Sequence, residues 1–84
     1  MSKDPKTFLY ETLEKTLQYH ATPTQLEALR NREDLDLDGL ALSSLHTVEV
    51  QMELEDGLGV DIETEEFEGL TRLSELVTLV ASRQ

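Results

Sequence analysis

Residues 40–56 read LALSSLHTVEVQMELED, and the rest of the chain is organised around them. A loop turns into a helix here, and two serines stand at the turn. At 100° per residue, the helix carries apolar residues on two nearly opposite sides. The first stripe consists of Leu45, Val48 and Met52, and the second stripe of Val50, Leu54 and Leu58.

Acidic residues border the first stripe. Glu49, Glu53 and Asp56 lie on one flank and Glu55 lies on the other. A helix that packs once onto a core needs a single apolar stripe, so a second stripe rimmed with carboxylates indicates a surface that a basic partner covers. The periodicity is equally compatible with two buried stripes, one of them under a loop.

The length and composition predict one small domain over residues 1–84, with little room for a deep catalytic cleft. The absence of cysteine excludes disulfides, thiolate metal sites and cysteine nucleophiles. No apolar run reaches the ~18 residues of a membrane span, and no apolar segment typical of a signal peptide follows the first charges. We therefore expect a soluble cytoplasmic protein.

The formal net charge is −11, and its distribution is uneven. Thirteen acidic residues and no Lys or Arg lie between Glu33 and Thr71. Such a surface repels nucleic acids and anionic membranes and attracts basic proteins or cations. A surface that is acidic only for solubility would have the same composition.

Start signals and apolar spacing predict three main helices and a short fourth. Asp4-Pro5 begins a helix that runs to about Tyr19, and the organising helix begins at Ser43 or Ser44 and ends near Asp56-Gly57. Gly57 is predicted to be its left-handed cap. Thr71 is predicted to cap a last helix, in which apolar residues follow the helical period at Leu73, Leu76, Val77 and Val80.

Shorter features are expected between these helices. Thr22-Pro23 and Gln25 predict a short helix or helical turn near residues 23–30. Residues 31–42 read as a loop pinned by Leu35, Leu37 and Leu40, and Val60 and Ile62 are expected to enter the core from a loop. Thr64–Glu68 is predicted as a short helical segment that ends at Gly69, with Phe67 facing inward.

Asp34–Gly39 matches the first half of a helix-loop-helix calcium loop, D-x-D-x-D-G. The second half fails, because positions nine and twelve of the motif are Leu42 and Leu45. Without a carboxylate at position twelve, a cation has too few oxygen ligands, so no calcium-sensor site and no other dedicated metal site is predicted. The three aspartates are expected at most to attract Ca²⁺ or Mg²⁺ weakly.

The inventory of reactive residues argues against catalysis. His20 and His46 lack neighbours at metal-ligand spacing, and no nucleophile elbow or glycine-rich phosphate loop is present. We expect His20 to be a helix-terminal residue favoured by the helix dipole. A phosphate on a serine at a helix start would be well tolerated, although local sequence alone favours the simpler interpretation that Ser43 and Ser44 only cap the helix.

The order of these residues resembles the acyl carrier protein family. Residues 40–49 resemble the signature L-G-x-D-S-L-x-x-V-E, residues 58–62 resemble F-G-V-x-I, and residues 71–76 resemble T-V-x-D-L. The similarity runs without gaps from Leu40 to the C-terminus, whereas the first forty residues agree in helix pattern and length only.

The resemblance implies an all-α four-helix bundle that carries covalent 4′-phosphopantetheine on Ser44 and holds intermediates as thioesters. It implies a monomeric shuttle in fatty acid or polyketide biosynthesis, not an enzyme. Its partners would be a phosphopantetheinyl transferase and acyl-transferring or synthase enzymes with basic docking patches, and the residues matching the partner-facing helix are Leu45, Val48, Glu49, Met52, Glu55 and Asp56. Val50 and Leu54 would line the core or an acyl pocket.

Two alternatives to an acyl carrier stay open. One is an aminoacyl or peptidyl carrier of the same fold, and the other is an acidic cation-binding or adaptor module without the arm. The chain departs from the signature at Ser43, where the family has an aspartate that helps the transferase recognise its substrate. His46, where the family often has an acid, is consistent with a specialised partner.

Overall fold

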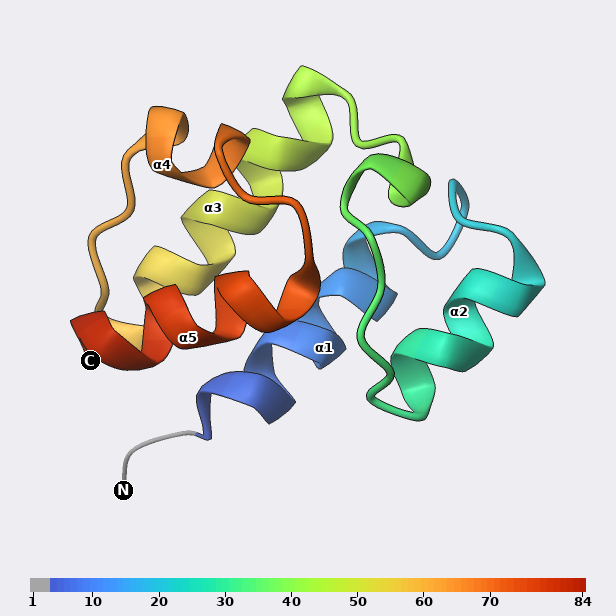
Figure 1. Ribbon diagram of the computed structural model, residues 1–84, viewed down its shortest axis with the longest axis horizontal. Coiled ribbons are helices and arrows are strands. Elements are labelled where there is room, and N and C mark those ends of the chain that lie inside the picture. The colour runs from blue at the N-terminus through green and yellow to red at the C-terminus, as the bar shows by residue number, and fades with distance from the viewer. Residues whose placement is uncertain (1–3) are drawn as a thin grey trace.

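The structure, a computed structural model, describes residues 4–84 and confirms an all-α bundle (Figure 1). Three longer helices, two shorter ones and one turn of 3₁₀ helix follow one another along the chain: α1 (Pro5–Thr16), α2 (Pro23–Arg30), η1 (Asp38–Leu40), α3 (Ser44–Leu58), α4 (Thr64–Glu68) and α5 (Leu73–Arg83). Helix α1 packs against α2, α3 and α5, so it is central to the bundle. Helix α2 lies at one end of the molecule and the C-terminus of α5 at the other.

Helix α1 begins as predicted but ends early. The Asp4 carboxylate accepts the Thr7 N–H at 3.0 Å, and Pro5 occupies the first helical position. The helix was expected to reach Tyr19, yet it ends at Thr16 with Leu17 as its C-terminal cap. Leu17 is fully buried, so the apolar period does continue to this residue. Its carbonyl accepts the N–H groups of His20 and Ala21, and these hydrogen bonds turn the chain towards α2.

Helix α2 has the predicted capping box. Gln25 N donates to Thr22 Oγ1 at 3.1 Å, and Thr22 N donates to the Gln25 side chain at 3.0 Å. The same Gln25 side chain donates through Nε2 to the Gly39 carbonyl at 2.7 Å. One residue therefore both starts α2 and holds the segment that leads to α3.

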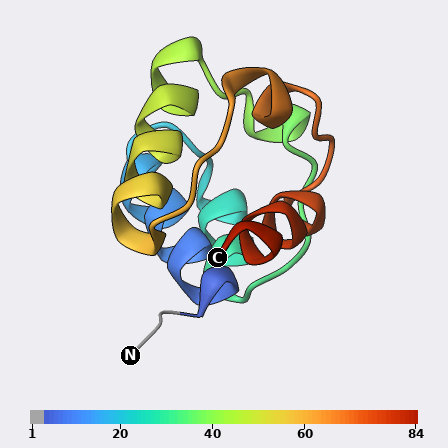
Figure 2. The ribbon, with the colours of Figure 1, turned by 90° about the vertical axis from the view of Figure 1, so that its left-hand side faces the viewer.

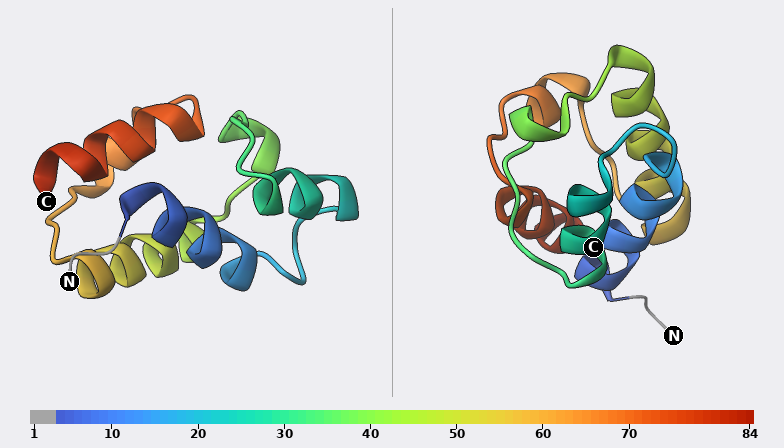
Figure 3. Two further views of the ribbon diagram at one scale, coloured as in Figure 1. Left: turned by 90° about the horizontal axis from the view of Figure 1, so that it is seen from below. Right: turned by 90° about the vertical axis from the view of Figure 1, so that its right-hand side faces the viewer.

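The segment 31–42 is pinned to the bundle (Figure 3). Leu37 and Leu40 are buried and Leu35 is half-buried, as predicted. Leu37 N donates to the Thr71 carbonyl and Leu73 N donates to the Leu35 carbonyl, each at 2.9 Å. The segment is thus held beside the start of α5, and its only helical turn is η1.

The predicted end of α3 is wrong by two residues. Gly57 lies inside α3, and Gly59, with φ 68°, is the left-handed cap that donates to the Glu55 carbonyl at 3.0 Å. A Cβ at residue 57 would overlap the ring of Phe8 on α1, so this glycine permits a close approach of α1 and α3.

Helix α4 is confirmed, with Phe67 buried and Gly69 at its end. The predicted cap of α5 is wrong, because Arg72 rather than Thr71 precedes the first helical residue. The carboxylate of Glu75, in the first turn, accepts the N–H groups of Thr71 and Arg72 at 2.9 Å. The backbone N–H groups that precede α5 are therefore hydrogen-bonded by a residue of the helix itself, and Thr71 is a donor to Glu75 rather than the cap of the helix.

The core is built from all five α-helices together with the connecting segments. Val60 and Ile62 enter it from the α3–α4 connection, as predicted. Its buried members are Leu9, Tyr10, Leu13, Leu17, Leu29, Leu37, Leu40, Val50, Leu54, Val60, Ile62, Phe67, Leu73, Leu76 and Val80.

Candidate functional site

Ser43 is the N-terminal cap of α3. Its Oγ accepts the His46 N–H at 3.2 Å and lies 3.1 Å from His46 Nδ1. Ser43 N donates to the same Nδ1 at 3.4 Å. The Ser43 hydroxyl is therefore occupied by a reciprocal cap in which a histidine takes the place of the usual Glu or Gln.

Ser44 is the first residue of α3, and its side chain is exposed. Its hydroxyl makes no hydrogen bond to any residue between 4 and 84. The N–H groups of Ser44 and Leu45 precede the first intrahelical hydrogen bond, which Thr47 N donates to Ser43 O at 3.0 Å. Free N–H groups and the positive end of the helix dipole favour an anionic group at this point.

The backbone before Ser43 is held by a residue far away in the sequence. His20 Nε2 lies 3.2 Å from the Leu40 carbonyl and 3.0 Å from the Ala41 carbonyl. The His20 ring also packs against His46, with 4.4 Å between the ring centroids. His20 thus holds the segment that leads to α3. The helix-terminal role predicted for it is wrong, because α1 ends at Thr16 and His20 lies in the turn that follows. Ala41 has a left-handed backbone, with φ 51°.

The two stripes of α3 have different environments. Val50 and Leu54 of the second stripe are fully buried. Leu45, Val48 and Met52 of the first stripe are 66%, 44% and 57% exposed. The interpretation with two buried stripes is therefore wrong, and the first stripe is an apolar surface on one side of Ser44.

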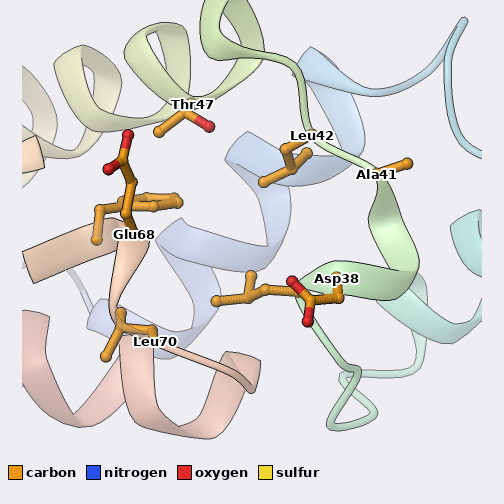
Figure 4. A pocket seen from close by; sticks show the side chains of 8 residues that line it. Asp38, Ala41, Leu42, Thr47, Glu68 and Leu70 are labelled. Carbon is orange, nitrogen blue, oxygen red and sulfur yellow. The ribbon is translucent and has the colours of Figure 1, made fainter. Parts of the chain in front are cut away.

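A pocket of about 220 Å³ opens beside the start of α3 (Figure 4). In Figure 4 the Glu68 carboxylate points towards Thr47, while Asp38 lies across the opening on η1. The other lining residues are apolar: Leu37, Ala41, Leu42, Phe67 and Leu70. Val50 and Leu54 do not line this pocket and belong to the core.

Residues 21–80 match a protein family described as a phosphopantetheine attachment site, which covers most of the chain, from the end of the α1–α2 turn into α5. The chain belongs to this family. Comparisons with curated proteins and with solved structures return no match.

Covalent 4′-phosphopantetheine is the cofactor of this carrier protein. The start of α3 fits the group, because it offers an exposed serine hydroxyl without an intramolecular partner, beside unpaired N–H groups. None of the helices between residues 4 and 84 is long and apolar enough to cross a membrane.

The acidic residues around the first stripe of the carrier differ in their contacts. Glu49 and Asp56 are exposed, and neither carboxylate has an ion-pair or hydrogen-bond partner among residues 4–84. Glu53 pairs with Lys15 of α1 at 3.1 Å. The Glu55 carboxylate accepts the Ile62 N–H at 3.2 Å, so it also holds the α3–α4 connection.

Two of the three aspartates of the calcium-like loop, Asp34 and Asp36, bind protein groups in the carrier. Asp34 accepts from Arg72 Nε and from Ser74 N, each at 2.9 Å, and Asp36 lies 3.3 Å from Arg72. The Arg72 hydrogen bond, followed by that of Ser74, lowers the pKa of Asp34 below its ordinary range. Within residues 4–84 no group of three or more potential metal ligands converges.

Proposed function

We propose that this carrier holds acyl intermediates on a 4′-phosphopantetheine arm joined to Ser44 Oγ and delivers them to partner enzymes. The observation that supports Ser44 is the different bonding of two adjacent serines. The Ser43 hydroxyl caps α3 through His46, whereas the Ser44 hydroxyl is exposed and has no intramolecular partner. A transferase can therefore reach Ser44 without uncapping the helix.

The residues around Ser44 each have a role in this function. When bound, the arm supplies a terminal thiol that holds the cargo as a thioester. The N–H groups of Ser44 and Leu45 stabilise the negative charge of the phosphodiester at the helix start. The Ser43–His46 cap keeps this turn in place while the arm is attached and used.

The first stripe and its acids are proposed as the surface that partner enzymes bind. Leu45, Val48 and Met52 supply apolar area, and Glu49 and Asp56 supply unpaired negative charge beside it. A partner with a basic rim around an apolar contact fits such a surface. Glu55 is part of the same border, although its carboxylate also holds Ile62 N.

The lining of the pocket beside α3 indicates which kind of cargo the carrier could hold. Five of its eight lining residues are apolar, which is compatible with a short acyl group that folds back from the arm. Asp38 and Glu68 at the opening favour a second candidate, an aminoacyl carrier, because their carboxylates would attract a cargo amino group.

Intact-mass measurement after incubation with coenzyme A and a phosphopantetheinyl transferase tests the carrier function. We expect a gain of one phosphopantetheine, as Ser44 Oγ forms a bond to phosphorus and adenosine 3′,5′-bisphosphate leaves. The holo protein is then offered to acyl-loading and aminoacyl-loading enzymes, and acyl loading is expected. An unchanged mass with several transferases would support an adaptor module without an arm.

A further inference from the structure

Two segments of this highly charged chain contain no acidic residue, lysine or arginine. They are residues 16–26, TLQYHATPTQL, and residues 39–48, GLALSSLHTV. Charged residues make up 30% of the sequence, so two uncharged runs of this length are unexpected in a domain of net charge −11. The second run contains Ser44.

The fold brings these two segments together. Gln25 Nε2 donates to the Gly39 carbonyl at 2.7 Å, and His20 Nε2 contacts the carbonyls of Leu40 and Ala41. The His20 and His46 rings pack against each other at 4.4 Å. In Figure 2 the light-blue turn after α1 lies beside the first part of α3. We call residues 16–26 and 39–48 together the neutral platform.

The platform carries an exposed aromatic side chain. Among residues 4–84, four large hydrophobic side chains are exposed: the three of the first stripe and Tyr19, which is 94% exposed. The carbonyl of Leu17 accepts the N–H groups of His20 at 2.9 Å and of Ala21 at 2.8 Å, so hydrogen bonds hold the turn that presents Tyr19. All the large exposed apolar groups therefore lie on α3 or on the turn that His20 fastens to it.

We propose that the phosphopantetheinyl transferase binds across the neutral platform, with Tyr19 as an aromatic anchor in addition to the first stripe. The proposal rests on the proposed function, because the transferase must reach Ser44 Oγ. A stable interface covers about 800 Å² on each partner, more than three side chains of α3 provide. Interface cores are poor in charge and rich in Tyr, with charged residues at the rim. The platform matches such a core, and Glu49 and Asp56 match the rim.

The replacement of the signature aspartate adds to this argument. Ser43 is engaged with His46, so the chain offers no carboxylate next to Ser44 for a basic group of the transferase. Contacts with uncharged groups of the platform are therefore expected to supply the affinity that a carboxylate at residue 43 would otherwise supply. Tyr19 is the exposed side chain of the platform best suited to that role, since an aromatic ring buries much area at little entropic cost.

The test compares Tyr19→Ala, Tyr19→Phe and a surface control on α5, Thr78→Ala, as substrates of the transferase. We expect Tyr19→Ala to lower kcat/KM about tenfold, mainly through KM, as loss of an interface anchor does. The Phe variant and the control should stay near wild type. The loss should be similar at low and high salt, because an apolar contact is not screened. Equal kcat/KM for wild type and Tyr19→Ala would overturn the proposal.

Binding to a carrier that cannot be modified separates this proposal from the proposed function. In a Ser44→Ala background, the transferase should bind measurably, and adding Tyr19→Ala should raise Kd about tenfold. His20→Ala should also weaken binding, and His20→Gln, which keeps a donor for the Leu40 and Ala41 carbonyls, should restore it. If the transferase does not modify the wild-type protein but its binding depends on Tyr19, the proposed modification of Ser44 would be overturned and the platform would stand. Binding that is absent or indifferent to Tyr19 would overturn the platform.

Discussion

Ser43 and Ser44 have identical side chains, and their surroundings assign them different roles. Local sequence could not separate the two, because a histidine three residues after a cap is not part of the usual capping box. In the structure His46 Nδ1 lies within 3.4 Å of Ser43 N. Ser43 is therefore engaged in the cap, whereas the Ser44 side chain remains exposed. The predicted helix start at Ser43 or Ser44 was correct, whereas the bonding that distinguishes them depended on a rotamer of His46.

Ala41 is the residue at which the backbone before α3 is strained. Its φ of 51° is left-handed, and the carrier signature has glycine at this position. A left-handed residue with a Cβ costs ~1–2 kcal/mol, and glycine costs ~0.5–1 kcal/mol in unfolded-state entropy. Ala41→Gly should therefore stabilise the protein by roughly 0.5–1 kcal/mol in chemical denaturation.

Ala81→Gly is the matched control for Ala41→Gly. Ala81 is exposed inside α5, so this glycine should destabilise by about 1 kcal/mol or less. Destabilisation of similar size by both substitutions would mean that Ala41 carries no strain.

Helix α3 shows what periodicity can and cannot predict about an element. The 3.6-residue spacing correctly separated two apolar sides, but only packing shows that Val50 and Leu54 are buried while Leu45 and Met52 are exposed. The end of the helix was misplaced because Gly57 and Gly59 both suit a left-handed cap. The Phe8 ring occupies the space beside Gly57, which no local pattern could predict.

The unpaired acids of α3 should act on partner binding and hardly on folding. We expect Glu49→Lys with Asp56→Lys to lower kcat/KM for a partner enzyme at low salt, because rim charges steer association. Raising the salt concentration should lower kcat/KM for the wild type and reduce the difference in kcat/KM between the wild type and the double variant. Glu55 is left unchanged, since its reversal would also remove the Ile62 hydrogen bond. Equal rates at low salt would show that partners bind elsewhere.

The start of α5 should depend on pH through Asp34. Hydrogen bonds from Arg72 and Ser74 lower its pKa below 3.8, so near that pH the unfolded chain binds more protons at this group than the folded protein does. Its stabilisation is therefore complete above an ordinary aspartate pKa and is lost as pH falls through the lower folded value. Asp34→Asn should be less stable than wild type at neutral pH, and the difference should vanish in acid. A difference in the free energy of unfolding that is independent of pH would contradict this role.

At the scale of the whole molecule, the all-α architecture and most of the core could be predicted, because caps and apolar periods are local. The contacts that shape the site join distant residues. His20 reaches Leu40, Ala41 and His46, and Asp34 reaches Arg72, so neither interaction has a signal in any short stretch of sequence. The same kind of long-range pairing, between Arg72 and the aspartates at positions 34 and 36, gives two acids of the calcium-like pattern a structural role.

The net charge of −11 should make the whole fold sensitive to salt. Repulsion among the acids is screened over ~10 Å at 0.1 M salt, and the exposed pairs, such as Lys15 with Glu53, contribute little that screening could remove. We expect Tm to rise with sodium chloride. Because Asp34 and Asp36 bind Arg72, millimolar Ca²⁺ should add little beyond its ionic strength. A Tm that falls with salt would mean that the ion pairs outweigh the repulsion.

The central claim is that Ser44 carries the arm while Ser43 holds the helix, and one comparison of single variants tests it most directly. Ser43→Ala and Ser44→Ala are each incubated with coenzyme A and a transferase, and intact mass and the free energy of unfolding are measured for both. We expect Ser43→Ala to lose about 1 kcal/mol, the usual cost of an N-terminal cap, and still gain one phosphopantetheine. Ser44→Ala should keep wild-type stability and gain nothing. Modification of Ser44→Ala, or an unmodified Ser43→Ala that remains folded, would contradict the account.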